Sequence, residues 1–96
     1  SRVAALHTQG EEFYWGYCLM EPVESETLAA AMEKAGGLKS VRNVKSHAGY
    51  RDWFISAFKR PGFTLELGRG INPLPLSQFD EICRRTFPVL DTIVLA

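Results

Sequence analysis

The stretch Gly62-Phe-Thr-Leu-Glu-Leu-Gly68 decides the fold class of this chain. Between the two glycines, Phe63, Leu65 and Leu67 alternate with polar residues, which is the pattern of a β-strand with one buried face. Glu66 places a carboxylate in the middle of that strand. Burying a carboxylate is costly unless it is paired, solvated in a cleft or functional. The pattern therefore predicts a strand over Phe63 to Leu67 and leaves Glu66 either on a wet sheet face or in a functional site.

The segments before this strand alternate between strand and helix patterns. Their residues predict, in chain order, a strand over Arg2 to Leu6, a strand over Glu12 to Met20, a helix over Val23 to Ala35, a short strand around Val41 to Val44 and a helix over Arg51 to Phe58. Glycines at 36 and 37 are a strong stop for the first helix. This order of elements is that of an α/β protein.

A loop over Gly68 to Leu76 and a long amphipathic helix follow the strand. Ser77 is a candidate N-cap with Asp80 three residues on, in an arrangement like a capping box. Pro88 lies inside the helix and is expected to kink it or split it. The apolar side of this helix is expected to comprise Phe79, Ile82, Cys83, Phe87 and Leu90.

The strand over Arg2 to Leu6 is apolar on both faces, and such strands normally lie inside a wider sheet covered by helices. A free-standing version would leave open strand edges, so self-association through those edges is expected. The chain starts at Ser1 and leads straight into this apolar run, as an excised piece or a mature product does, so we expect upstream sequence. We therefore expect a mixed sheet flanked by helices that is incomplete as a stand-alone domain.

Composition excludes some partners. Lys and Arg together number 11 and balance 11 Asp and Glu, so there is no electrostatic case for a nucleic-acid partner. No apolar run approaches the roughly 18 residues that a membrane span needs. Cys18 and Cys83 are far apart and form neither a disulfide framework nor a metal knuckle. Two reduced thiols favour a cytoplasmic location, while export or cell-wall association stays open.

His7 is the second residue with a possible chemical role. It ends the apolar strand and precedes the break Thr8-Gln9-Gly10. Metal ligands and catalytic groups often lie at strand ends, although a lone histidine is also a common structural residue. The pattern alone leaves both interpretations of His7 open.

Three motifs, taken in order, resemble the zinc carboxypeptidase family. Ala-Leu-His7-Thr-Gln-Gly-Glu-Glu-Phe-Tyr-Trp resembles the strand that brings the third zinc ligand. Asp52-Trp53 followed by residues 62–68 resembles the segment with the catalytic glutamate, and residues 72–82 resemble the loop and opening of the C-terminal helix. The residues of these motifs are most similar to those of the bacterial branch that cleaves γ-D-glutamyl–diamino acid bonds in cell-wall peptides. The likeness runs from about Val3 to the end, and implies that residues 1–96 are the C-terminal part of a zinc peptidase catalytic domain.

The resemblance implies a role for each of the two residues. His7 would be the third zinc ligand, and Glu66 would take a proton from the zinc-activated water and pass it to the leaving amine. In this family the other two ligands come from a His-x-x-Glu motif, which does not occur in this chain. We therefore expect zinc in the complete domain, but neither tight zinc binding nor peptidase activity from this chain alone.

Substrate contacts are implied at three further residues. Arg51 matches the position that lines the pocket for the residue after the scissile bond, where its cation would suit the second carboxylate of diaminopimelate. The alternative is a solvated surface arginine. Thr8 and Gln9 follow the ligand and are candidate substrate contacts. The aromatic run around Tyr14 is expected to be core.

Three functions remain open at this point. The first is hydrolysis of a γ-D-glutamyl–meso-diaminopimelate bond in a muropeptide. The second is a carboxypeptidase that removes a C-terminal acidic or polar residue. The residues that hold a substrate's terminal carboxylate in this family would decide between these two functions, and they lie upstream of His7. The third is a non-catalytic α/β interaction module, derived from this fold, that binds a partner through its open sheet edge and retains His7 and Glu66 as relics.

Overall fold

The computed structural model describes residues 1–17, 19–42 and 49–96 and has an α/β architecture. The strands are β1 (Val3–Thr8), β2 (Glu12–Trp15), β3 (Lys39–Val41) and β4 (Gly62–Leu67). The helices are α1 (Ser25–Gly36), α2 (Tyr50–Phe58) and α3 (Phe79–Leu95), the last preceded by a short 3-10 turn over Leu76–Gln78. The predicted α/β class, a mixed sheet flanked by helices, is confirmed.

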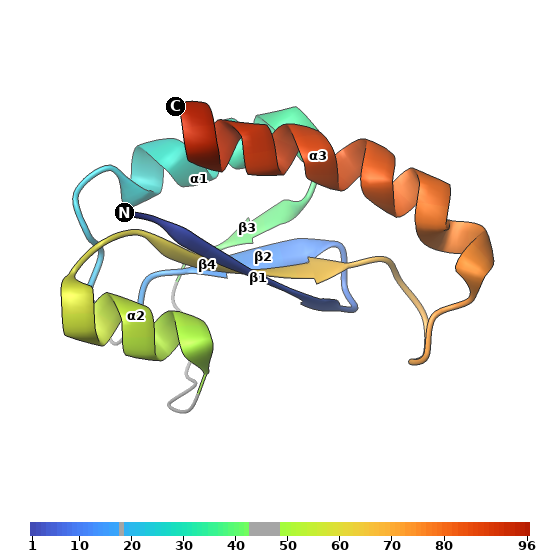
Figure 1. Ribbon diagram of the computed structural model, residues 1–96, viewed down its shortest axis with the longest axis horizontal. Coiled ribbons are helices and arrows are strands. Elements are labelled where there is room, and N and C mark those ends of the chain that lie inside the picture. Colours follow the sequence, from blue (N-terminus) through green and yellow to red (C-terminus); the bar gives the residue numbers. More distant parts are fainter. Residues whose placement is uncertain (18, 43–48) are drawn as a thin grey trace.

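The four strands form one mixed sheet in the order β1-β4-β2-β3. The central strand β4 runs parallel to β1 and antiparallel to β2, and β2 runs parallel to β3. Helices α1 and α3 lie on one face of the sheet and α2 lies on the other (Figure 1). Within the described residues, the outer edges of β1 and β3 are unpaired.

The hydrophobic core fills the face under α1 and α3. It contains Phe13 from β2, Phe63 and Leu65 from β4, Met32 from α1 and Val89 from α3, all of them fully buried. The rings of Phe13 and Phe63 meet edge to face, with centroids 6.3 Å apart. The alternation along β4 thus sends its apolar side chains into this core, as the sequence predicts.

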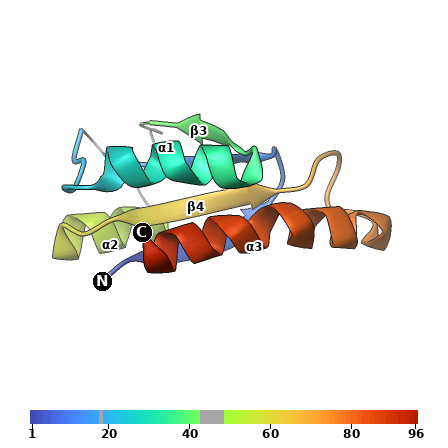
Figure 2. The ribbon, with the colours of Figure 1, turned by 90° about the horizontal axis from the view of Figure 1, so that it is seen from above.

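Helices α1 and α3 lie side by side across the sheet (Figure 2) and are in close contact at Gly36. A Cβ at Gly36 would lie 2.5 Å from the carbonyl oxygen of Arg85 and closer still to Val89 Cγ2. Arg85 also donates from Nε to the carbonyl of Gly36 and from Nη2 to that of Gly37, both at 3.1 Å. Gly37 itself has a φ of 71° and ends α1, as predicted.

Arg2 joins the two ends of the chain. Its Nη1 donates to the carbonyl of Ile93 at 2.8 Å, and its Nη2 forms an ion pair of 2.6 Å with Glu24. The last turn of α3 is therefore tied to β1 and to the start of α1.

Several predicted boundaries are wrong for local reasons. β2 ends at Trp15 rather than Met20, because Gly16 takes a φ of 81° that breaks the strand. α1 starts at Ser25 rather than Val23, because Glu24 is left-handed with a φ of 76°. The short strand ends at Val41. The rest of that predicted strand, at 43 and 44, lies outside the described residues.

The start of α3 differs from the prediction at its cap. Gln78, not Ser77, occupies the N-cap position, and no side-chain cap bond is made there. The Gln78 amide instead bonds the backbone of Arg69 in both directions, accepting at 3.1 Å and donating at 2.8 Å. Ser77 lies inside the preceding 3-10 turn, so the predicted capping box with Asp80 is wrong.

Pro88 does not split α3, which runs unbroken from Phe79 to Leu95. A proline inside a helix costs about 3 kcal/mol, and packing of Val89 and Ile93 against the core offsets that cost. The buried stripe passes through Thr86, Val89 and Ile93, so the prediction that Phe79 and Phe87 face the core is wrong. Both phenylalanines are exposed, by 62% and 60%.

Two further sequence observations can be placed. Cys83 on α3 is a free, half-buried thiol, and Cys18 lies outside the described residues. Among the helices that the structure describes, none combines the length and apolarity required to traverse a bilayer.

Substituting Gly36→Ala tests the close contact of α1 and α3. The added methyl must displace backbone rather than a flexible side-chain tip, so we expect the free energy of unfolding to fall by about 1–3 kcal/mol. Urea denaturation followed by circular dichroism measures it. Ala35→Ser, at the exposed neighbouring position, is the matched control and is expected to change stability by about 0.5 kcal/mol or less. Equal effects of the two substitutions would contradict this packing.

Candidate active site

Strand register brings His7, Glu66 and Glu12 into one row across the sheet. In the parallel pair of β1 and β4, His7 lies opposite Glu66, and in the antiparallel pair of β2 and β4, Glu12 lies opposite Glu66. Side chains at paired positions point to the same face and stand roughly 5 Å apart. The sequence nominates His7 and Glu66 separately, and the fold makes them neighbours.

The row lies on the face that α2 only partly covers. Helix α2 packs over the other end of β1 and β4, where a Cβ on Gly62 would touch Phe54, Ile55 and Val3 at 3.4 Å. Farther along the same face, Glu66 is half-buried and His7 is exposed. Within the described residues the row is therefore partly exposed, while its strands are held by the core behind them.

Tyr14, two residues after Glu12 on β2, extends the same face. Its hydroxyl donates to Glu12 Oε2 at 2.5 Å. That hydrogen bond, followed by burial and the negative charges of Glu12 and Glu66, raises the pKa of Tyr14 to about 12, while Arg51 opposes the shift. Glu12, Glu66 and Arg51 therefore all act on Tyr14, which remains a donor across the neutral range.

Arg51 reaches this group from the first turn of α2. Its side chain is only 3% exposed, and its guanidinium carbon lies 5.8 Å from the centre of the Tyr14 ring. Nε donates to Asp52 Oδ1 at 3.1 Å and Nη2 donates to the same oxygen, while Asp52 Oδ2 accepts from the backbone N–H of Gly49 at 3.3 Å. The alternative of a solvated surface arginine is therefore wrong.

One nitrogen of Arg51 has no hydrogen-bond partner. Nη1 is buried, and no acceptor among the described residues meets it. A buried donor without a partner costs about 1–3 kcal/mol. An incoming acceptor, above all an anionic one, would remove that cost.

Thr8 and Gln9 lie apart from the row. Alternation along β1 sends Thr8 to the opposite face from His7, and its hydroxyl donates to Asn72 Oδ1 at 2.7 Å. Asn72 Nδ2 donates back to the Thr8 carbonyl at 3.3 Å. Gln9 is exposed in the turn that leads to β2. Their proposed contact with substrate stays a prediction.

The described residues supply part of a metal site at most. No group of three or more His, Cys, Asp or Glu side chains in the part of the chain that the structure describes could hold a metal ion. His7 offers one imidazole at an exposed strand end. A zinc ion bound through His7 would need its remaining protein ligands from outside these residues.

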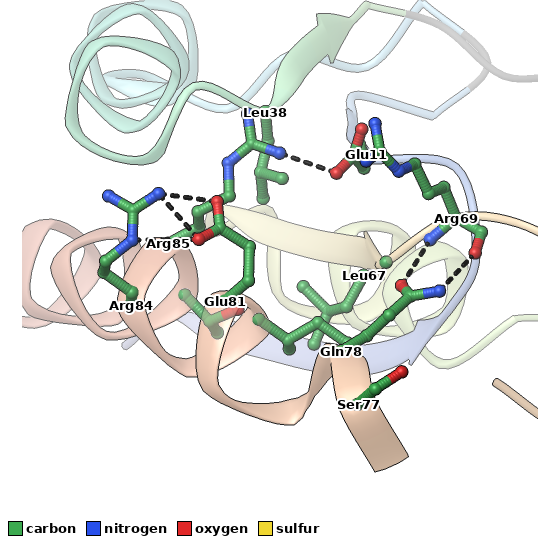
Figure 3. A pocket seen from close by; sticks show the side chains of 12 residues that line it. Glu11, Leu38, Leu67, Arg69, Ser77, Gln78, Glu81, Arg84 and Arg85 are labelled. Atoms are coloured by element: carbon green, nitrogen blue, oxygen red, sulfur yellow. Dashed lines mark hydrogen bonds and ion pairs between the residues drawn. The ribbon is translucent and has the colours of Figure 1, made fainter. Parts of the chain in front are cut away.

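A pocket of about 570 Å³ lies elsewhere, beside α3 and the end of β4 (Figure 3). Its charged side chains are largely paired with one another: Arg85 binds Glu11 at 2.7 Å, and Arg84 binds Glu81. None of the predicted site residues lines it. The row on the opposite face, rather than this pocket, is the candidate site.

The sequence analysis missed Glu12 and Tyr14. The signal was present in the alternation of β2, because Phe13 and Trp15 are buried and so Glu12 and Tyr14 must face the other way. The four-residue strand was obscured by the longer aromatic run to Met20, which reads as core throughout.

Two known proteins share sequence with this chain. The chain is 50% identical over 80 residues to gamma-D-glutamyl-L-diamino acid endopeptidase 1 of Lysinibacillus sphaericus, a match that takes in 83% of this chain and 20% of that protein. The chain is similar to a peptidase. It is also 50% identical over 91 residues to the uncharacterized protein YqgT of Bacillus subtilis (strain 168), covering 93% of this chain and 24% of that protein. No family model matches the chain.

These matches are strong but cover only part of each relative. The chain spans about a fifth to a quarter of the length of the curated relatives it matches. The matches therefore concern one segment of two longer proteins and not their full length.

Titration of tyrosine absorbance tests the Tyr14–Glu12 contact. One of the three tyrosines is expected to ionise near pH 12, and Glu12→Gln is expected to lower that midpoint because the hydrogen-bonded negative charge is gone. Tyr50→Phe is the control and should leave the late transition in place.

The same contact predicts how stability changes at alkaline pH. Because the folded pKa of Tyr14 lies above the ordinary value of about 10, its contribution is complete below pH 10 and is lost as pH rises through about 12. The stability difference between the native chain and Tyr14→Phe should shrink across that window. A late transition that survives Tyr14→Phe would contradict the assignment.

Proposed function

We propose that this chain is the C-terminal part of a zinc peptidase catalytic domain, in which Glu66 is the general base and His7 is one zinc ligand. The observation that carries the proposal is the register that sets His7 beside Glu66 on an open sheet face. It is supported by the 50% identity to an endopeptidase that acts on γ-D-glutamyl-L-diamino acid bonds.

The chain's own residues suit this division of roles. Zinc in such sites lowers the pKa of a water molecule and polarises the scissile carbonyl. Glu66, half-buried on the central strand, would accept the proton from the attacking water and deliver it to the leaving amine. Strands on both sides of β4 would hold Glu66 fixed relative to His7.

The proposed substrate is a cell-wall muropeptide cut at a γ-D-glutamyl–meso-diaminopimelate bond. The second carboxylate of that diamino acid would meet the idle Nη1 of Arg51. A carboxypeptidase that removes a C-terminal acidic residue would use the same arginine, and the residues that decide between the two lie outside this chain. Processing of released muropeptides fits the cytoplasmic location that we propose.

The rest of the domain is proposed to continue the sheet beyond β1. The outer edge of β1 is unpaired, and Leu6 on it is 52% exposed. Because the chain spans only a fifth to a quarter of its relatives, most of such a domain would lie outside it. Self-association of the isolated chain through this edge stays a prediction, as does the alternative of a non-catalytic binding module.

The proposal is tested on a longer protein that carries this segment together with an upstream His-x-x-Glu motif. We expect that protein, and not the 96-residue chain, to hold one zinc per molecule and to hydrolyse L-Ala-γ-D-Glu-meso-diaminopimelate. Glu66→Gln should lower kcat by at least about 100-fold, as for loss of a general base, with zinc content unchanged.

Zinc analysis and a ninhydrin assay of the released amine give the two readouts. Glu11→Gln is the matched control, because this neighbouring carboxylate binds Arg85 away from the row. If the longer protein neither binds zinc nor cleaves any peptide, the peptidase proposal is contradicted and the non-catalytic binding module becomes the favoured function.

A further inference from the structure

Two opposite charges flank Tyr14, and the function proposed above uses only that of Arg51. Glu12 lies on one side, bonded to the Tyr14 hydroxyl, and Arg51 lies against the ring. Glu12 is the register neighbour of Glu66 but comes from a different strand. Its second oxygen has no partner among the described residues, and no ion pair links Glu12 to its other register neighbour, Lys39.

We propose that Glu12 and Arg51 form a zwitterion clamp that binds the far end of the substrate's diamino acid, with Glu12 on the side-chain ammonium and Arg51 on the side-chain carboxylate. The inference rests on the proposed function and adds a residue and a selectivity to it. It assigns these two residues to diamino acids whose side chain ends in both groups, as in meso-diaminopimelate.

The contacts already made by Glu12 prepare it for an ammonium. Tyr14 occupies Oε2, which leaves Oε1 without a partner among the described residues. Since the pKa of Tyr14 lies near 12, its hydroxyl donates to Glu12 throughout the neutral range. A carboxylate beside a protonated amine makes a charge-assisted hydrogen bond.

The contacts of Arg51 prepare it for a carboxylate in the same way. Asp52 engages Nε and Nη2 and holds the guanidinium plane, while Nη1 is the group without a partner. Asp52 is held in turn by the Gly49 amide. A second carboxylate at Nη1 would complete the set of hydrogen bonds that the protein leaves unfinished.

The two halves of the clamp reject different analogues. A lysine side chain carries the ammonium but no carboxylate, so it leaves Arg51 Nη1 unpaired. A 2-aminopimelate side chain carries the carboxylate but no ammonium, so it leaves the charge of Glu12 unpaired. A buried or half-buried polar group without its partner lowers affinity, so both analogues should bind more weakly than meso-diaminopimelate.

Calorimetric binding to the longer protein carrying Glu66→Gln, which blocks hydrolysis, separates these contributions. The ligands are L-Ala-γ-D-Glu tripeptides that end in meso-diaminopimelate, L-lysine or L-2-aminopimelate. We expect the first to bind about 10- to 100-fold more tightly than either other, the range of one charge-assisted hydrogen bond.

Two added substitutions should give a crossed pattern. Glu12→Gln should remove the preference for meso-diaminopimelate over 2-aminopimelate and keep the preference for meso-diaminopimelate over lysine. Arg51→Gln should keep the first preference and remove the second. Glu12→Gln keeps the size of the side chain and an acceptor for Tyr14, so it remains informative if the buried Arg51→Gln fails to fold. Glu11→Gln is the matched control and should change neither preference, because Glu11 pairs with Arg85 instead.

The outcomes separate the clamp from the peptidase proposal. The crossed pattern supports the clamp even if the protein with Glu66 intact hydrolyses nothing, in which case the proposed function alone falls. A different result overturns the clamp alone: the protein with Glu66 intact hydrolyses the peptide, and Glu12→Gln either weakens the binding of all three tripeptides equally or changes the binding of none. Absence of binding by any tripeptide overturns both.

Discussion

Pairing of β4 on both of its edges is the constraint on which the candidate site depends. The apolar residues of β4, such as Phe63 and Leu65, enter the core, so Glu66 must face the other way. Parallel pairing with β1 then fixes His7 beside Glu66, and antiparallel pairing with β2 fixes Glu12 on its other side. A slip of one residue in either pair would move a member of the row to the opposite face and separate the charges.

The two faces of the sheet consequently differ in kind. Under α1 and α3 the face is closed by apolar packing, by the contact at Gly36 and, at its rim, by the ion pair of Arg85 with Glu11. On the α2 side, polar groups remain incompletely satisfied: Nη1 of Arg51 has no acceptor within the described residues, and Glu12 uses one oxygen. Stability is concentrated on the first face, and the polar groups without a full set of hydrogen-bond partners lie on the second.

Much of the fold could be predicted from sequence, because patterns within single segments determine where most strands and helices form. Alternation over Phe63 to Leu67 identified the central strand and the outward direction of Glu66, and Gly37 ended its helix as expected. Ser77 as a cap was wrong, and of the kink or split predicted at Pro88 the split does not occur. Both outcomes depend on distant contacts, namely the Gln78 side chain with Arg69 and the packing of α3 on the core.

The composition of the site was less predictable than the strands. Its register, the burial of Arg51 and the grouping of Glu12 with Tyr14 follow from how strands and helices meet, and no single segment encodes that. His7 and Glu66 stood out in their strand patterns, and a resemblance to zinc carboxypeptidases implied their roles. Glu12 was not part of that resemblance, and its place in the row follows from the alternation of β2 and its pairing with Glu66.

The central claim is that His7 binds the metal while Glu66 stands beside it without binding. Anomalous diffraction at the zinc edge, on crystals of the longer protein, tests this most directly. The account predicts a zinc ion at about 2.0–2.1 Å from a ring nitrogen of His7, with other protein ligands from outside this segment and the Glu66 carboxylate outside the coordination shell. A zinc ion that is bound without His7, or that has Glu66 as a ligand, would contradict the account.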